Sequence, residues 1–183
     1  MAENQNTSTA GAQIVESATR AAFDKPLVTN VYRSVIVEAI VDAALRPAWR
    51  WCSADYAGWD FEHASGAHLE VKQSAAKQSW TASSKGYVAP RFDIAERTGF
   101  WVGATFFPGQ GRNAHIYVFA FHPRTDDAAD HREPDQWVFY VLAASDLPAA
   151  KSIRLSSVAK LVDACSFGDL ANAVEATRLK LGQ

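Results

Sequence analysis

The sequence has few cysteines and no long apolar run. Its only cysteines, Cys52 and Cys165, lie far apart and show neither CxxC nor metal-ligand spacing. Such residues are typical of reduced thiols in a cytosolic compartment. No apolar run reaches the roughly 18 residues needed to span a bilayer, and residues 1–12 lack the basic start and apolar middle of a secretion signal. The sequence therefore predicts a cytoplasmic protein with no membrane segment.

The balance of charge excludes a positive field over the whole chain. Lys and Arg number 18 and Asp and Glu number 20, for a formal net charge of -2. Any nucleic-acid site must then be a local patch. A length of 183 residues with 48% hydrophobic residues suits one compact α/β domain. We expect the polar residues 1–11 to form a flexible arm and residues 12–183 to form that single domain.

Capping residues and apolar runs predict the helices. The apolar run from Asn30, with Thr29 or Asn30 as N-cap and Pro47 beyond its end, predicts a buried helix of about four turns. A shorter helix is expected over 13–23. Two closing helices are expected to begin at Ser156 or Ser157 and at Asp169.

Aromatic and β-branched residues predict the strands. They are dense at 115–122 and 136–143, which we expect to be central strands, and a short strand is expected near Ile153. The Trp- and Gly-containing segment 85–112 is expected to be an irregular insertion.

A β-hairpin is predicted at 56–75, where YAGWDFEH and HLEVKQSA alternate apolar and polar residues. The length of the loop decides which side chains meet, because a slip of one residue turns every side chain to the other face. A three-residue loop that ends at a left-handed Gly66 opposes Asp60 to Glu70. The same loop placed one position later opposes Asp60 to Lys72, and a four-residue loop separates Asp60 from Glu70.

The apolar pattern favours an odd loop. Only then do the apolar residues of both arms share one buried face, and these are Trp59, Phe61, Leu69 and Val71. Glu70 and Lys72 then project together from the other face. A solvated hairpin with cross-strand ion pairs would show the same pattern.

Two carboxylates beside a lysine suit chemistry at a phosphodiester. Oxygen ligands from Asp60 and Glu70 can hold Mg²⁺, completed by phosphate oxygens and water. Such a metal stabilises charge on the phosphoryl group and lowers the pKa of an attacking water. Lys72 would orient or deprotonate that water, or neutralise the developing charge. Glu38, inside the apolar helix, is the expected third carboxylate, because it is costly to bury without a partner; an arginine is the alternative partner.

The spacing of Asp60, Glu70 and Lys72 resembles the core of the PD-(D/E)xK nucleases, the superfamily that includes restriction endonucleases and Holliday-junction resolvases. The resemblance implies that both acidic residues bind Mg²⁺, with Mn²⁺ as a substitute, and that the lysine assists the nucleophile. It also implies a restriction-endonuclease-like α/β core, a mixed sheet of four to five strands flanked by helices.

Further positions extend the resemblance. A helix glutamate and a polar residue after the lysine are common in the family, matched here by Glu38 and Gln73. The strings EVKQSAAKQSW, RFDIAERTGFW, YVFAFHP and DQWVFYVL resemble a bacterial branch of the superfamily over 31–174. Trp59 departs from the pattern, because it stands in place of the proline in the family's name, which is often absent.

Basic residues that follow the motif are the expected contacts to a nucleic-acid backbone, and these are Lys77, Lys85, Arg91 and Arg97. Scattered surface charge is the alternative. The sequence thus predicts a Mg²⁺-dependent nuclease that acts on DNA, and homodimers are common in such folds. Two alternatives stay open: a catalytically idle nuclease-like fold that serves as a nucleic-acid-binding or protein-interaction scaffold, and an interaction protein that uses the Trp-containing insertion.

Overall fold

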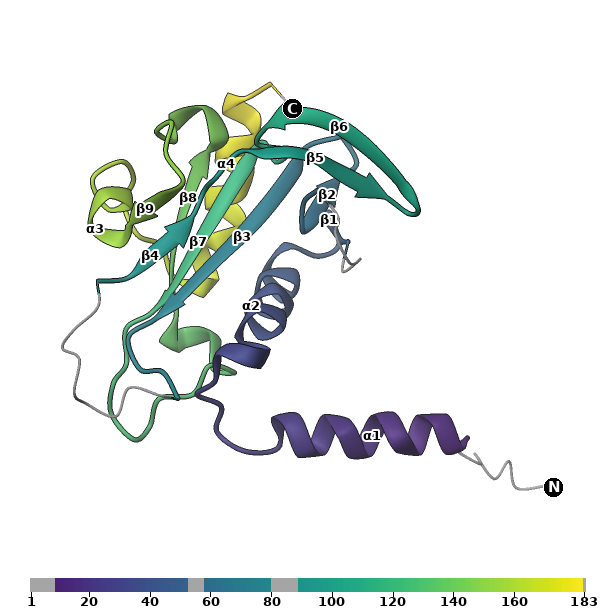
Figure 1. Cartoon of the computed structure of the whole chain (residues 1–183). Helices are drawn as coiled ribbons and strands as arrows, with labels where there is room; N and C mark the ends of the chain where they lie inside the picture. The colour runs from purple at the N-terminus through teal and green to yellow at the C-terminus, as the bar shows by residue number, and fades with distance from the viewer. Residues whose placement is uncertain (1–8, 53–57, 80–88, 183) are drawn as a thin grey trace.

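The computed structural model describes residues 9–52, 58–79 and 89–182. Helices begin the chain, strands form its middle, and helices close it (Figure 1). The helices are α1 (Ala10–Phe23), α2 (Asn30–Leu45), α3 (Leu155–Val158) and α4 (Leu170–Lys180), with short 3-10 turns at Pro134–Gln136, Ala144–Asp146 and Phe167–Asp169. The strands are β1 (Trp49–Trp51), β2 (Phe61–His63), β3 (His68–Ala75), β4 (Arg91–Asp93), β5 (Arg97–Val102), β6 (Thr105–Gly111), β7 (Ile116–His122), β8 (Val138–Ala143) and β9 (Ser152–Arg154).

The main sheet has five strands in the order β1-β2-β3-β7-β8. Strands β3 and β7 are parallel, and the other neighbours are antiparallel. The protein is therefore an α/β protein with a mixed five-stranded sheet flanked by helices, as expected. Of the two strands predicted to be central, only β7 is interior. β8 lies at the edge of the sheet, where Phe139 forms an isolated bridge with Cys165.

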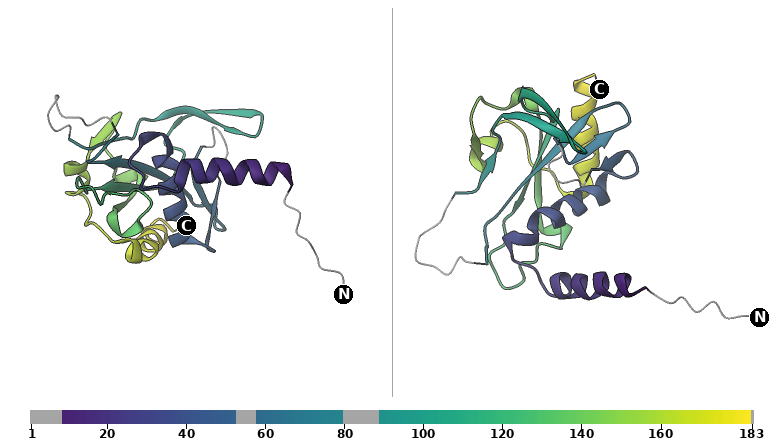
Figure 2. Two further views of the ribbon diagram at one scale, coloured as in Figure 1. Left: turned by 90° about the horizontal axis from the view of Figure 1, so that it is seen from below. Right: turned by 45° about the vertical axis from the view of Figure 1, so that its right-hand side comes forward.

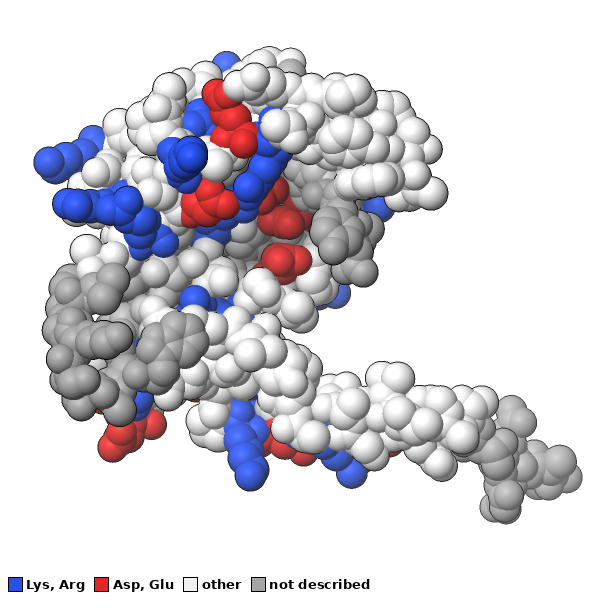
Figure 3. Space-filling model, viewed as in Figure 1, with Lys and Arg blue, Asp and Glu red and all other residues white. Residues whose placement is uncertain are grey.

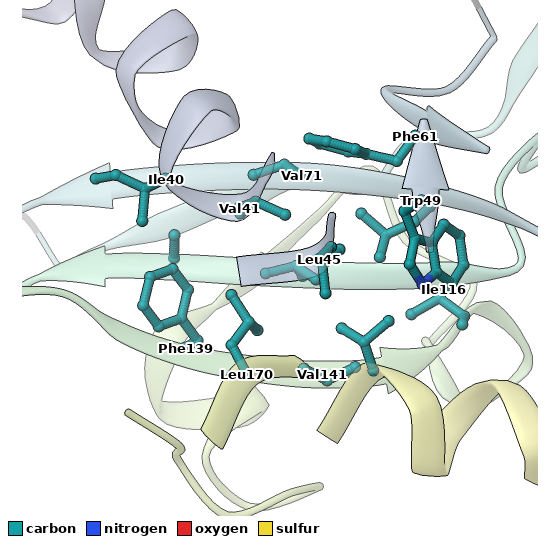
Figure 4. Packing of buried hydrophobic residues seen from close by; sticks show 14 of the residues in the cluster. Ile40, Val41, Leu45, Trp49, Phe61, Val71, Ile116, Phe139, Val141 and Leu170 are labelled. Atoms are coloured by element: carbon teal, nitrogen blue, oxygen red, sulfur yellow. The ribbon is translucent and has the colours of Figure 1, made fainter. Parts of the chain in front are cut away.

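Apolar side chains cover both faces of the sheet. On one face, α2 and α4 pack on the strands, with Val41 and Leu170 against Val71 and Ile116 (Figure 4). On the other face, the small sheet of β4 and β9 and the short helix α3 build a second cluster around Phe119. Strand β7 is consequently buried on both sides.

The segment 85–112 is not irregular where it is described. β4 pairs with β9, and β5 and β6 form a hairpin. The strands were missed because the hairpin is interrupted by a register shift between Arg97 and Gly99 and includes Pro108. Its side chains also pack outside the main sheet, so its apolar pattern does not follow one buried face.

Capping explains where the N-terminal helices begin. The Thr29 hydroxyl accepts from the N–H of Val31 at 3.3 Å, and α2 ends at Leu45, two residues before Pro47, as predicted. The hydroxyl of Thr9 caps α1 in the same way. Helix α1 therefore begins at Ala10, so the last two residues of the expected arm 1–11 are helical, and residues 1–8 lie outside the described residues.

Helix α1 has no buried residue and projects from the body that the other elements form (Figure 2). A single domain over 12–183 stays a prediction. At the C-terminal end, α4 begins after Asp169 as predicted, but α3 begins after Arg154, so Ser156 and Ser157 lie inside that helix and are not its caps. Over the described ranges, no helix is both long and apolar enough to cross a membrane.

Candidate functional site

The loop of the β2–β3 hairpin has the odd length that the apolar pattern favoured. Its third residue, Gly66, has φ of 88°, a left-handed conformation that glycine adopts without strain. The strands pair in the register that sets Phe61 against Leu69. The predicted register is confirmed through Phe61 and Leu69, whereas Asp60 precedes β2 and is not paired with Glu70 in the described ladder.

The two faces of the hairpin divide as expected, with one exception. Glu70 and Lys72 lie on the face of β3 opposite to its buried apolar residues. Trp59, however, does not join Phe61 in the α2-side cluster. Its ring stacks on His68, with centroids 3.4 Å apart, and packs against the cluster on the other face. Residue 59 precedes β2, so the alternation of the strand does not extend to it.

Asp60 lies beside the edge of β3 that no described strand pairs with beyond Leu69. Strand β3 has eight residues and β2 has three, and among the described residues β2 pairs with β3 only as far as Leu69. The N–H of Asp60 donates to the Leu69 carbonyl at 3.0 Å, and the N–H of Val71 donates to Asp60 Oδ2 at 2.7 Å. The carboxylate thus satisfies the backbone where a neighbouring strand would have continued, which fixes its position.

A cavity of about 330 Å³ opens at this edge, between α2, β3 and β4. Its wall includes all five side chains for which the sequence predicted chemistry, namely Glu38, Asp60, Glu70, Lys72 and Gln73. Figure 3 shows acidic and basic side chains gathered around a hollow below the β5–β6 hairpin. The fold therefore joins residues from one helix and two strands in one charged cavity.

Lys72 and Glu70 form an ion pair inside the cavity. Lys72 Nζ donates to Glu70 Oε1, and each side chain is 19% exposed. Partial burial reduces screening by water and salt, so this pair interacts more strongly than a pair on the open surface. The ammonium group is thereby held beside the carboxylates.

The carboxylates of the cavity have perturbed acidities. The pKa of Asp60 is raised from 3.8 to about 7, first by burial and then by the negative charge of Glu70; the hydrogen bond from Val71 opposes the rise, and Lys72 lowers it as well. Burial also raises the pKa of Glu38. Burial disfavours the charged form of a carboxyl group, and a second carboxylate adds to that cost. The cavity therefore favours the approach of a cation.

Neighbouring side chains orient Glu38 and Gln73. Trp51 Nε1 donates to Glu38 Oε2 at 3.0 Å, so the partner of this glutamate is an indole and not the arginine considered from the sequence. The buried Arg33 donates through Nε to Gln73 Oε1. Both contacts leave the end of each side chain fixed at the cavity wall.

The basic residues predicted to contact a nucleic-acid backbone divide between the site and other places. Arg91 lines the cavity, and Arg97 lines an adjoining one, where it pairs with Asp93 at 2.7 Å. Lys77 does not reach the site, because its Nζ donates to the Asp126 carbonyl. Lys85 lies outside the described residues.

Three residues at the site were missed from the sequence. Ser34 and Asp93 line the same cavity as Asp60. Tyr117 pairs with Glu70 across the parallel β3–β7 ladder, and burial and then the charge of Glu70 raise its pKa to about 12. Only Ser34, four residues before Glu38 in the predicted helix, carries a sequence signal, because residues at this spacing share a helix face.

The donor set fits a hard cation in an open site. Three of the acidic side chains of the cavity have one oxygen held by a donor: Asp60 Oδ2 by Val71, Glu70 Oε1 by Lys72 and Glu38 Oε2 by Trp51. Over the part of the chain that the structure describes, no group of three or more His, Cys, Asp or Glu side chains is arranged to hold a metal. Mg²⁺, however, is usually bound by one or two carboxylates, with waters and substrate phosphates as the other ligands. Asp60 and Glu70 could supply carboxylates of this kind.

Comparisons of the chain with family models, with curated proteins and with solved structures found no match. The fold and the cavity define an α/β protein with an acidic, lysine-containing site at a sheet edge. The resemblance to the PD-(D/E)xK nucleases stays a prediction.

Proposed function

We propose that this protein is a Mg²⁺-dependent nuclease with a restriction-endonuclease-like core, which hydrolyses phosphodiester bonds, most readily in DNA. One observation carries the proposal: Asp60, from the start of the odd-looped hairpin, and Glu70, from its second strand, line one cavity together with Lys72 and Glu38. An amphipathic surface hairpin gives no reason for a helix glutamate to join the strand residues. A nuclease site of the PD-(D/E)xK kind does.

Asp60 and Glu70 would hold the metal in this proposal, because Val71 and Lys72 each occupy only one oxygen of these two carboxylates. Glu38 adds negative charge to the same cavity. When bound, Mg²⁺ supplies positive charge to the phosphoryl oxygens and lowers the pKa of the attacking water.

Lys72 acts on the water and on the developing charge. Its ammonium group lies in the cavity beside Glu70, where it donates a hydrogen bond to the incoming water or to a phosphate oxygen. Gln73, fixed by Arg33, offers its amide as a further donor at the cavity wall. Arg91, an exposed residue of the cavity wall, binds a neighbouring phosphate.

Plasmid, single-stranded and branched DNA, each incubated with Mg²⁺, Mn²⁺ or EDTA, test the proposal. We expect cleavage with either metal, none with EDTA, and a loss of at least about 100-fold in Lys72→Ala, in line with the removal of a group that stabilises transition-state charge. Lys180→Ala is the matched control, because this exposed lysine ends α4 on the far side of the sheet. Equal cleavage by wild type and Lys72→Ala would refute the proposal.

A second candidate function is a nucleic-acid-binding or protein-interaction scaffold with an idle site. The Lys72–Glu70 ion pair favours it, since a lysine that neutralises Glu70 competes with a metal for that carboxylate. This alternative predicts binding of DNA with the same affinity in Mg²⁺ and in EDTA, and no cleavage in either.

A further inference from the structure

A second cavity adjoins the acidic one and has a different character. It also has a volume of about 330 Å³, and its wall shares Glu70, Lys72 and Asp93 with the first cavity. Beyond these shared residues, the β5–β6 hairpin forms a large part of its wall, including the aromatic rings of Trp101 and Phe106. A molecule that reaches Lys72 from this side therefore passes along an aromatic surface.

The hairpin presents its rings on two faces. Trp101 pairs with Phe106 across the two strands, and their ring centroids lie 5.3 Å apart at 53°. Adjacent residues of a strand point to opposite faces, and the neighbouring pair, Phe100 and Phe107, stacks on the other one. Phe100 also packs on Trp59, which anchors the hairpin to the body, and it lines the second cavity together with Trp101 and Phe106. The Trp101–Phe106 pair remains available to a ligand.

Both rings of this pair are incompletely covered by the protein. Trp101 is 44% exposed and Phe106 is 43% exposed, although large aromatic side chains usually bury most of their surface. Asn113 and Arg97 line the same cavity and supply hydrogen-bond donors, and the amide of Asn113 also supplies an acceptor. Flat aromatic surfaces with polar groups at their margin suit a flat, polar-edged ring as ligand.

We propose that this second cavity takes an unpaired nucleobase next to the scissile phosphate, so that the substrate is a nucleic-acid strand that is single-stranded at the cut. This inference rests on the proposed nuclease function. Every base has a π face, and aromatic side chains bind unpaired bases by stacking with little regard to sequence. A base inside a duplex is already stacked and paired, and it must leave the helix to enter such a pocket.

Charge and continuity favour a nucleic-acid strand over an apolar partner. The aromatic cavity leads directly to Lys72 and Glu70, and Arg97 stands on its wall. A volume near 330 Å³ is at the lower end of the roughly 300–1,000 Å³ range of small-molecule sites, which suits one base rather than a protein segment. A base in this cavity and its phosphate beside Lys72 can belong to the same strand.

Binding of oligonucleotides that contain 2-aminopurine tests the inference without cleavage. Measured in EDTA, the fluorescence of this base falls when it stacks on an aromatic ring. We expect quenching on binding to the full-length protein, an affinity for the single strand about tenfold or more above that for the matched duplex, and a similar loss of single-strand affinity in Trp101→Ala. Phe107→Ala is the matched control, because Phe107 is 45% exposed on the same hairpin but does not line the cavity; circular dichroism melts check that each variant folds.

Three results would overturn the inference: equal affinity for single strand and duplex, unchanged binding by Trp101→Ala, or an equal loss in Phe107→Ala. A change of self-association in Trp101→Ala, with strand binding intact, would assign the rings to a contact between copies of the chain and would overturn it too. The two proposals fail separately. Fluorescence quenching without metal-dependent cleavage would refute the nuclease proposal and support the base pocket. Lys72-dependent cleavage of duplex and single strand at equal rates, without quenching, would refute the base pocket and support the nuclease proposal.

Discussion

Asp60→Asn is expected to stabilise the fold at pH 8 although it removes a proposed metal ligand. Asparagine keeps an oxygen that can accept from the N–H of Val71, but it carries no charge for burial to disfavour. In the wild type, the pKa of Asp60 is raised from 3.8 to about 7, first by burial. Between these two pH values the folded state keeps a proton that the unfolded state has lost. The stability of the wild type therefore falls as the pH rises through this window, and the whole loss is present above it.

The size of the effect follows from the change in acidity. At about 1.4 kcal/mol for each tenfold change, a pKa moved from 3.8 to about 7 corresponds to an upper limit of about 4 kcal/mol. Asp60 lines an open cavity, where solvent screens part of that penalty. We therefore expect Asp60→Asn to raise the free energy of unfolding by about 2 kcal/mol at pH 8 and to leave it unchanged near pH 4.

Urea unfolding, followed by tryptophan fluorescence between pH 4 and pH 8, measures this difference. Glu62→Gln is the control on the same hairpin; its carboxylate pairs with Arg50 near the surface, so the variant should change stability by less than about 1 kcal/mol. Mg²⁺ should stabilise the wild type and not Asp60→Asn, since only the wild type offers the ligand. A variant that is less stable than the wild type at pH 8, or a difference that does not change with pH, would refute the reasoning.

Three further predictions concern the hairpin and the core. Leu69→Ala empties a fully buried position and should lower the free energy of unfolding by about 3 kcal/mol in urea titrations; a loss under about 1 kcal/mol would contradict the packing. Gly66→Ala should cost about 1 kcal/mol in thermal melts and keep cleavage, because φ is 88° and nothing lies within 4 Å of a new Cβ; an unchanged melting temperature would contradict the left-handed turn. His131 is fully buried, and burial is the first cause that lowers its pKa from 6.5 to about 4. Between these pH values the unfolded state binds a proton that the folded state excludes, so the free energy of unfolding should fall by up to about 3 kcal/mol as the pH decreases through this window. In urea titrations, His131→Phe should remove this contribution to the pH dependence, and a profile identical to that of the wild type would contradict the prediction.

The hairpin that carries the site could be predicted because local chemistry decides it. Gly66 permits the left-handed turn, and the alternation along β3 allows only an odd loop if the apolar residues are to be buried together. The helix with Glu38 was predictable for a similar reason, since Thr29 caps it and Pro47 follows its end. Register and capping act over a few residues, so the sequence contains the whole signal.

The remainder of the site depends on contacts between distant segments. Tyr117 meets Glu70 only because β3 and β7 are parallel neighbours, and no local pattern specifies that pairing. Asp93 reaches the cavity because β4 pairs with β9 outside the main sheet. Trp59 was assigned to the wrong face because the alternation was extended past the end of a three-residue strand.

The rate of Mg²⁺-dependent cleavage of one labelled oligonucleotide by the wild type and by Glu70→Gln tests the central claim most directly. Glu70 lines one cavity with Asp60, pairs with Lys72 and also lines the second cavity, and the glutamine keeps its size while removing its charge. The account predicts cleavage by the wild type that EDTA abolishes, and a rate at least about 100-fold lower in the variant. Equal rates for the two proteins, or cleavage by the wild type that persists in EDTA, would contradict it.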